Sequence, residues 1–211
     1  MAPTQRYSRL DPDRRTALLE AATREFAMRG YDGASLAAIS EGAGFSKGSL
    51  YYYFADKADL FAEVLAGTVQ GSGLVLDPAA LTREGFWGEL QRFSESFFAE
   101  VERRPELLGV ARAYYGLSAA DREAPAIAAQ WGRLRRWLVN VVTRGQALGV
   151  VRRDLPVELT AEICLAIGGA VDAWTVTHLD ALPPEELVTL NAKVFEMFRL
   201  VTLPPGAEEK R

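Results

Sequence analysis

Cysteine and histidine are nearly absent from this chain of 211 residues, which contains one of each, Cys164 and His178. A single cysteine cannot close an internal disulfide, and this fits a reducing compartment. Nothing in the sequence has the spacing of a metal site, a nucleophile elbow or a glycine-rich phosphate loop. No apolar run approaches membrane-spanning length, and no apolar stretch follows the charged N-terminus. We therefore expect a cytoplasmic protein that is not an enzyme, binds no metal or cofactor and does not enter a membrane.

An excess of positive charge, common in proteins that coat nucleic acid, is also missing. The net charge is −4, from 24 lysines and arginines against 28 aspartates and glutamates. Residues 1–60 contain eight side chains of each sign and are neutral, so residues 61–211 contain the other 16 basic and 20 acidic ones. Any attraction to DNA must therefore come from the local placement of Arg6, Arg9, Lys47 and Lys57.

Apolar residues recur at helical spacing along most of the chain, and there is no strand pattern, internal repeat or low-complexity tract. The fold class is therefore predicted to be all-α. After a short polar arm, the first helix is predicted to be capped by Asp11, with Pro12 in its first turn. It should end near Arg29, because Gly30 can adopt the left-handed conformation of a C-cap.

Residues 35–57 predict a helix-turn-helix. Ser35 and Ser46 can each cap a short helix, and the glycines of residues 42–44 form a tight turn between the two. Leu50 and Phe54 lie four residues apart and share the buried face of the second helix. In this motif the second helix enters the major groove of DNA.

The remaining chain reads as a second, helical domain. Asp56 caps a connecting helix at residues 57–70, and glycines at residues 71–73 interrupt the pattern. Further helices are predicted at residues 86–101, 105–115, 125–148, 157–178 and 184–203. The domains are thus predicted as a DNA-binding domain at 1–57, a ligand-binding and dimerisation domain at 58–203, and a tail at 204–211.

The last two helices are more apolar than a surface helix needs to be. The glycine pair at 168 and 169 lies inside the first of them, where each glycine costs roughly 1 kcal/mol relative to alanine, so we expect a close helix-helix approach there. Two such helices can pair with those of a second copy as a four-helix bundle. The residues expected in this homodimer interface are Ile163, Ile167, Ala170, Trp174, Leu190, Val194 and Phe198.

Residues 30–65, GYDGASLAAISEGAGFSKGSLYYYFADKADLFAEVL, resemble the signature of the tetracycline-repressor (TetR) family of bacterial transcriptional regulators. The match covers the first third of the chain strongly, and residues 149–159 resemble a common C-terminal pattern of the family. Ser35, Ser40 and Phe45 stand where the family more often has Thr, Ala and a smaller aliphatic residue. We expect the Ser40 hydroxyl to bond back to the carbonyl of Leu36. The resemblance implies an all-helical homodimer with a variable ligand domain.

The DNA-contact residues expected from the motif and the resemblance are Ser35, Lys47, Gly48, Ser49, Tyr51, Tyr52, Tyr53 and Lys57. Lys47 and Lys57 are predicted to hold phosphates, and Gly48 to let the backbone approach the DNA. Ser49, Tyr52 and Tyr53 are candidates for base edges or thymine methyl groups, and Tyr51 resembles the family tyrosine that contacts the DNA backbone. The alternative is that one or two tyrosine rings, Tyr53 first, pack on the first helix and that Lys57 is simply solvated.

The family resemblance suggests that some of seven residues of the second domain line a pocket for a small hydrophobic effector. They are Trp87, Phe98, Tyr114, Tyr115, Trp131, Trp174 and His178. Each aromatic ring can equally be part of the core, His178 can cap helix carbonyls, and Cys164 fits a packed apolar position.

The function predicted is that of a repressor that binds a palindromic double-stranded operator as a homodimer and is released by the effector. Its two recognition helices would lie about 34 Å apart, one turn of DNA. The alternative is a helical ligand-binding dimer without a transcriptional role, for which the neutral charge of residues 1–60 is the main support.

Overall fold

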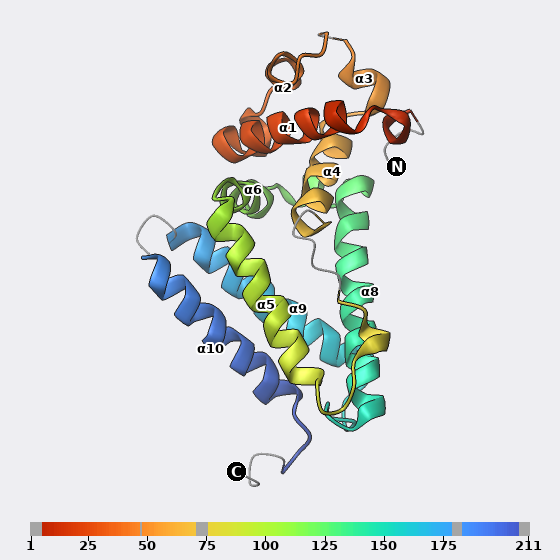
Figure 1. The fold of residues 1–211 in the computed structure, drawn as a ribbon, viewed down its shortest axis with the longest axis vertical. Coiled ribbons are helices and arrows are strands. Elements are labelled where there is room, and N and C mark those ends of the chain that lie inside the picture. Colours follow the sequence, from red (N-terminus) through yellow and green to blue (C-terminus); the bar gives the residue numbers. More distant parts are fainter. Residues whose placement is uncertain (1–5, 47, 71–75, 179–182, 207–211) are drawn as a thin grey trace. The chain divides into compact units, whose positions relative to one another are not determined.

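The computed structural model describes residues 6–46, 48–70, 76–178 and 183–206, and all regular structure in these ranges is helical (Figure 1). The predicted fold class is confirmed. The chain forms two compact units, one of residues 1–73 and 101–131, the other of residues 74–100 and 132–211.

The first unit contains a 3-10 turn, the helix-turn-helix and a group of later helices. Its elements are η1 (Tyr7–Arg9), α1 (Pro12–Gly33), α2 (Leu36–Gly42), α3 (Leu50–Tyr53), α4 (Lys57–Gln70), α6 (Glu106–Tyr115), α7 (Ala119–Arg122) and the start of α8 (Pro125–Leu148). The unit is larger than the predicted segment 1–57, because α4 and α6 both pack on α1. The limits of the DNA-binding part itself stay a prediction.

The ends of α1 follow the predicted signals. The carboxylate of Asp11 accepts hydrogen bonds from the backbone N–H groups of Asp13 and Arg14 at 3.1 and 3.3 Å. At the other end Gly30 has φ 68°, so the regular helix stops there and one further turn continues to Gly33. A residue with a Cβ rarely adopts this conformation, which explains the glycine.

The turn after α2 is a Schellman motif centred on Gly44, whose φ is 70°. The backbone N–H of Phe45 donates to the carbonyl of Ser40 at 2.8 Å, and that of Gly44 donates to the carbonyl of Glu41 at 3.1 Å. Phe45 then folds into the core and is 7% exposed. This geometry turns the chain between the two helices as predicted.

Two local expectations in this region are wrong. The regular part of α3 begins at Leu50 with Ser49 as its N-cap, whereas a cap at Ser46 was predicted. The Ser46 hydroxyl instead bonds to the Ser49 hydroxyl at 2.5 Å, and Gly48 disfavours an earlier helical start. The buried hydroxyl of Ser40 has no hydrogen-bond partner among the described residues, so the predicted bond to Leu36 is not formed.

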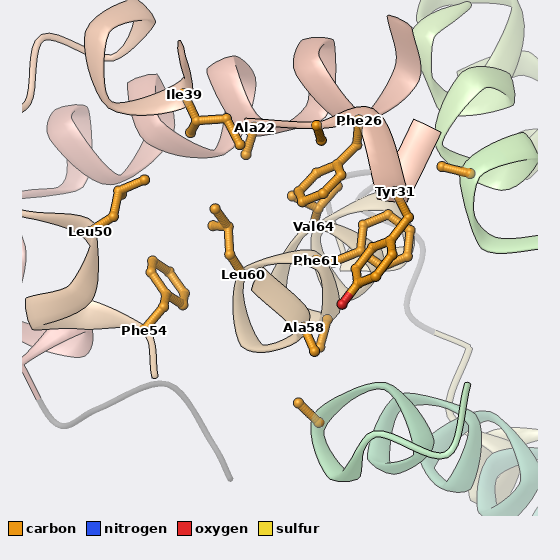
Figure 2. Close-up of a cluster of buried hydrophobic side chains, with 14 of the residues drawn as sticks. Ala22, Phe26, Tyr31, Ile39, Leu50, Phe54, Ala58, Leu60, Phe61 and Val64 are labelled. Carbon is orange, nitrogen blue, oxygen red and sulfur yellow. The ribbon is translucent and has the colours of Figure 1, made fainter. Parts of the chain in front are cut away.

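The core of the first unit is built around three aromatic rings from α1 and α4 (Figure 2). The ring centroids of Phe26 and Phe61 are 4.7 Å apart, and those of Tyr31 and Phe61 are 5.2 Å apart. Leu50 and Phe54 of the α3 region extend the same cluster and are 1% and 2% exposed. Burial of these two residues fixes which side of α3 remains accessible.

Tyr7 belongs to this core and not to a polar arm. Its side chain is buried, and its ring centroid lies 4.9 Å from that of Phe54. Burial, and next the carboxylate of Glu63, raises the pKa of the Tyr7 phenol well above its usual range. The segment before α1 is thereby fastened to the end of the recognition helix.

The second unit contains η2 (Pro78–Ala80), α5 (Phe86–Arg103), most of α8, α9 (Val157–His178) and α10 (Pro184–Thr202). The bounds of α8 and α9 and the start of α10 are as predicted. A buried cluster around Phe86, Val142 and Val151 forms its core. Gly145 of α8 fits there because a Cβ at this position would lie 2.7 Å from the Phe86 ring and would also overlap Val151.

Neither of the two predicted glycines of α9 marks an unusually close approach to α10 within one chain. A Cβ on Gly168 would lie 3.6 Å from the ring of Phe198, which is ordinary van der Waals contact, and one on Gly169 would meet no atom within 4 Å. The expectation of a close approach at these glycines is therefore not confirmed by the contacts of the single chain.

Helix α9 also corrects the expectation about apolar runs. Among the described residues it is the one helix long and apolar enough to cross a membrane by length and composition, and 22% of its most apolar window is buried within the chain. Acidic residues such as Glu158 and Asp172 divide the sequence of this helix into shorter apolar runs, and for this reason no run of membrane-spanning length was identified.

Candidate nucleic-acid interface

The α3 helix presents two tyrosines to its surroundings. Tyr51 and Tyr52 are 64% and 52% exposed, whereas tyrosine side chains in folded proteins are usually at least partly buried. Tyr53 is half-buried, and its ring meets Phe45 edge to face at a centroid distance of 6.0 Å. Two of the three tyrosines are therefore available for contact, and the third packs partly on the protein.

The small residues of the motif hold the local backbone. The Ser35 hydroxyl accepts a hydrogen bond from the N–H of Ala38 at 3.4 Å, which caps α2 as predicted. The N–H of Ser35 donates to the carboxylate of Glu25 at 3.0 Å, which ties α2 to α1. Gly48 is exposed, and a Cβ added there would meet no atom within 4 Å. Ser49 is half-buried. Lys47 lies outside the described residues.

Lys57 is held by the protein. Its ammonium group donates to the carbonyl oxygen of Asp32 at 3.1 Å and lies 4.7 Å from the centroid of the Tyr31 ring. An ammonium has three donors, so the bond to Asp32 leaves others for a phosphate. The side chain is half-buried, which differs from the alternative of a simply solvated lysine.

The start of α4 is fixed by two carboxylates. Asp56 accepts from the N–H of Asp59 at 2.8 Å, and the buried carboxylate of Asp59 reaches back to the N–H of Ala55 at 3.1 Å. The two carboxylates thus accept hydrogen bonds from backbone N–H groups at the start of α4, and these bonds fix the conformation of the segment between α3 and α4.

The candidate effector residues do not form a single site within either unit. Tyr114 stacks on Trp131 at a centroid distance of 6.4 Å, and Tyr115 meets Tyr114 edge to face, all in the first unit. In the second unit, Trp174 stacks on His178 at 4.3 Å. The imidazole Nδ1 of His178 lies 2.8 Å from the carbonyl of Trp174, which is the capping role considered for it. Nothing is described for the Phe98 side chain.

Trp87 borders a hollow of about 210 Å³ in the second unit. Its ring meets Phe195 of α10 edge to face at 6.4 Å. Facing polar groups include Ser94, whose hydroxyl donates to the side-chain oxygen of Asn191 at 2.8 Å, and Arg199, whose Nε is buried without a hydrogen-bond partner among the described residues. Sequence reasoning did not find these polar residues, since α5 and α10 are far apart in the chain.

The candidate dimer residues lie on partly exposed faces of α9 and α10. Trp174 is 48% exposed, Ala170 is also exposed, and the other five are half-buried in the single chain. Large apolar side chains continue these faces, namely Leu159, Met197 and Leu200, at 46–47% exposure. Cys164 is buried, as expected for a packed apolar position.

These features define a DNA-binding protein with a helix-turn-helix and a separate helical domain. A family model described as "Bacterial regulatory proteins, tetR family" matches residues 18–64, from within α1 to within α4. Residues 18–64 therefore have the DNA-binding domain of the TetR family, and the protein is a transcriptional regulator.

Curated relatives extend the likeness beyond the motif. The chain is 29% identical over 153 residues to the HTH-type transcriptional repressor AcnR of Corynebacterium glutamicum, covering 69% of this chain and 72% of AcnR. It is 29% identical over 150 residues to the repressor KstR2 of Mycobacterium tuberculosis, covering 69% and 73%. Because these relatives regulate transcription, the alternative of a helical dimer without such a role loses support.

Solved structures share the fold. The transcriptional regulator FadR from Bacillus subtilis, in complex with stearoyl-CoA, matches with a TM-score of 0.68 at 20% identity, covering 87% of this chain and 96% of FadR. At this identity the match concerns the architecture and not the ligand.

Proposed function

We propose that the protein is a repressor that binds a palindromic operator as a homodimer and releases it when a small hydrophobic effector binds. The observation that carries the DNA-binding part is the exposure of Tyr51 and Tyr52 on α3, while Leu50 and Phe54 fasten the same helix to the core. Tyrosine can contact phosphates through its hydroxyl and thymine methyl groups through its ring. Ser49 and Gly48 stand beside the tyrosines, and Lys47 and Lys57 supply charge for phosphates.

The two apolar helices α9 and α10 support the homodimer. Exposed apolar faces of this extent usually mark an interface. Two helices from each copy, related by a two-fold axis, would bury Trp174, Met197 and Leu200 in a four-helix bundle. Gly169, where an added Cβ would meet no atom within 4 Å in one chain, would then face the second copy.

A charged substitution tests the dimer interface. Ala170→Glu would place two carboxylates at the proposed two-fold contact, and dimerisation should weaken by at least tenfold in sedimentation velocity. Ala129→Glu, at an exposed position near the start of α8, is the matched control and should leave the association unchanged. A dimer of unaltered strength in the Ala170→Glu variant would exclude this surface as the interface.

Two observations support an effector: the fold is shared with FadR, which was solved in complex with stearoyl-CoA, and the second unit has a hollow beside Trp87. The hollow beside Trp87 is smaller than most ligand pockets, so it would hold only part of a larger molecule. Stearoyl-CoA, the ligand of FadR, is a suitable first probe because it combines an apolar chain with a polar head. An effector that lowers operator affinity a hundredfold must prefer the released state by about 2.7 kcal/mol.

The experiment measures two quantities on one sample. Fluorescence anisotropy follows a palindromic fragment of the protein's own upstream DNA, and thermal unfolding follows ligand binding, with stearoyl-CoA and free CoA compared. The proposal predicts tight binding to the fragment, and an effector that both raises the melting temperature and releases the DNA. Absence of binding to any upstream fragment would refute the repressor, and a ligand that stabilises without releasing DNA would refute the switch.

A further inference from the structure

A basic groove lies beside the exposed face of α3, in the first unit. It has a volume of about 400 Å³ and is open to solvent. Three arginines, one just before η1, one in η1 and one in α1, line it together with rings of the recognition helix. The full lining is Arg6, Arg9, Leu10, Asp11, Arg14, Tyr52 and Tyr53. The groove is thus continuous with the residues that the proposed function places on DNA.

Two of these basic side chains have flat aromatic supports. The guanidinium carbon of Arg6 is 4.3 Å from the centroid of the Tyr52 ring, and that of Arg14 is 4.5 Å from the centroid of Phe45. A guanidinium stacked on a ring keeps its N–H donors free around its edge, in the plane that suits a phosphate. Phe45 is one of the residues at which the chain departs from the usual family pattern, and it provides one of these supports.

The charge of the groove is not cancelled inside the chain. Among the described residues, no carboxylate forms an ion pair with Arg6, Arg9 or Arg14, and all three are exposed. The one carboxylate that lines the groove, Asp11, already accepts two backbone N–H groups as the cap of α1. The groove is therefore positive although residues 1–60 are neutral in total.

We propose that this groove binds the phosphate backbone next to the bases that α3 meets. Arg6 and Arg14 would each hold a phosphate, Arg9 would add charge, and the stack on Tyr52 would orient this ring as well as Arg6. The inference rests on the proposed DNA-binding function and adds a second, sequence-independent contact to it.

Salt dependence provides the test, because each phosphate contact releases counterions. Removing one contact should lower the steepness of log K against log [salt] by about 0.9 and weaken binding roughly tenfold at 0.1 M salt. The double variant Arg6→Ala/Arg14→Ala should therefore show about twice this change in slope, on operator and on unrelated duplex alike. The control Arg24→Ala/Arg29→Ala also removes two positive charges, from exposed positions of α1 outside the groove, and should retain the wild-type slope.

The aromatic support is tested separately. Tyr52→Leu removes the ring under Arg6 and should reduce the slope more than Tyr52→Phe, which keeps the ring and removes only the hydroxyl; equal slopes for the two variants would overturn the role of the ring. Thermal unfolding of each variant shows that the fold is intact before the DNA titration is interpreted.

The outcomes separate the inference from the function on which it rests. Failure of the wild-type protein to bind its operator would refute the proposed function. Operator binding by the wild type, with the same slope in the arginine double variant and in the control, would overturn the groove alone. A loss confined to the operator, with unrelated duplex bound as before, would also overturn it, because the arginines would then read bases.

Discussion

The ammonium group of Lys57 donates a hydrogen bond to the carbonyl oxygen of Asp32 at 3.1 Å. This bond joins the first turn of α4 to the last turn of α1, and the Tyr31 ring lies 4.7 Å from the same nitrogen. A cation in the first turn of a helix is unfavourable for the helix dipole, and these two contacts offset that cost. Lys57 therefore positions α4 and remains available to an approaching phosphate.

Replacement of Lys57 should affect stability as well as DNA binding. Lys57→Met keeps the apolar stem and removes the charge, and we expect the free energy of unfolding to fall by about 1 kcal/mol, since the site is half-buried. Lys57→Arg retains a cation and should restore most of this loss. Denaturant titration measures the free energy of unfolding of each variant. Equal stability of the methionine variant and the wild type would show that the bond to Asp32 contributes nothing.

Gly109 sets the distance between α6 and α1. A Cβ at this position would lie 2.7 Å from the Cβ of Ala27 and 2.8 Å from its carbonyl oxygen. Gly109→Ala should therefore destabilise the chain by about 1–3 kcal/mol through overpacking. Gly67→Ala in α4, where a Cβ meets no atom within 4 Å, should be neutral or stabilising. Similar melting temperatures for the two variants would contradict the close contact.

The buried hydroxyl of Ser40 is a built-in cost of the helix-turn-helix. Ser40 is 1% exposed, and its Oγ has no hydrogen-bond partner among the described residues. Ser40→Ala should raise the free energy of unfolding by about 1–2 kcal/mol, because it removes an unsatisfied polar atom and favours the helix. Thr16→Ala, at an exposed position of α1, serves as the control. A loss of stability on replacing Ser40 would mean that the hydroxyl is satisfied in solution.

Cys164 gives the stability a defined pH dependence. Burial raises the pKa of its thiol to about 11 from a usual value near 9.0. Between these values the unfolded chain releases the proton and the folded chain keeps it, so stability falls as the pH rises from about 9 to 11. The decline should be shallower for Cys164→Ala, and the curves should run parallel below pH 9. Urea titrations at pH 8, 9 and 10 measure this; identical slopes would show that the thiol titrates normally.

Much of the secondary structure could be predicted because its signals are local. Asp11, Ser35 and Asp56 cap the helices for which they were identified, and Gly30 and Gly44 stop helices by adopting positive φ. The long helices α8 and α9 begin and end at the predicted residues, since proline or glycine bounds each pattern at one end or more.

The features that were not predicted depend on contacts between distant segments. The burial of Tyr7 against Phe54 and the packing of Gly109 on Ala27 each join residues separated by more than forty positions. Composition alone marks Tyr7 as part of a polar arm, because its neighbours are polar. Nothing local distinguishes Gly109 from any other helical glycine.

In the candidate site, too, local features were predicted and contacts between distant segments were not. The motif identified the exposed tyrosines of α3, but it gave no sign that Arg14 would stack on Phe45 or that Lys57 would bond to Asp32. The candidate effector aromatics share helical spacing with core residues, and spacing cannot tell a pocket wall from a packed ring. The structure places Tyr114, Tyr115 and Trp131 in one group of rings and stacks Trp174 on His178 in another.

The most direct test of the account is the stoichiometry and residue dependence of operator binding. Sedimentation velocity with a labelled palindromic fragment should show two chains per fragment for the wild type, and loss of the complex for Tyr51→Ala/Tyr52→Ala, with the dimer itself retained. A single chain per fragment, or a complex of unchanged affinity without the two tyrosines, would contradict the central claim.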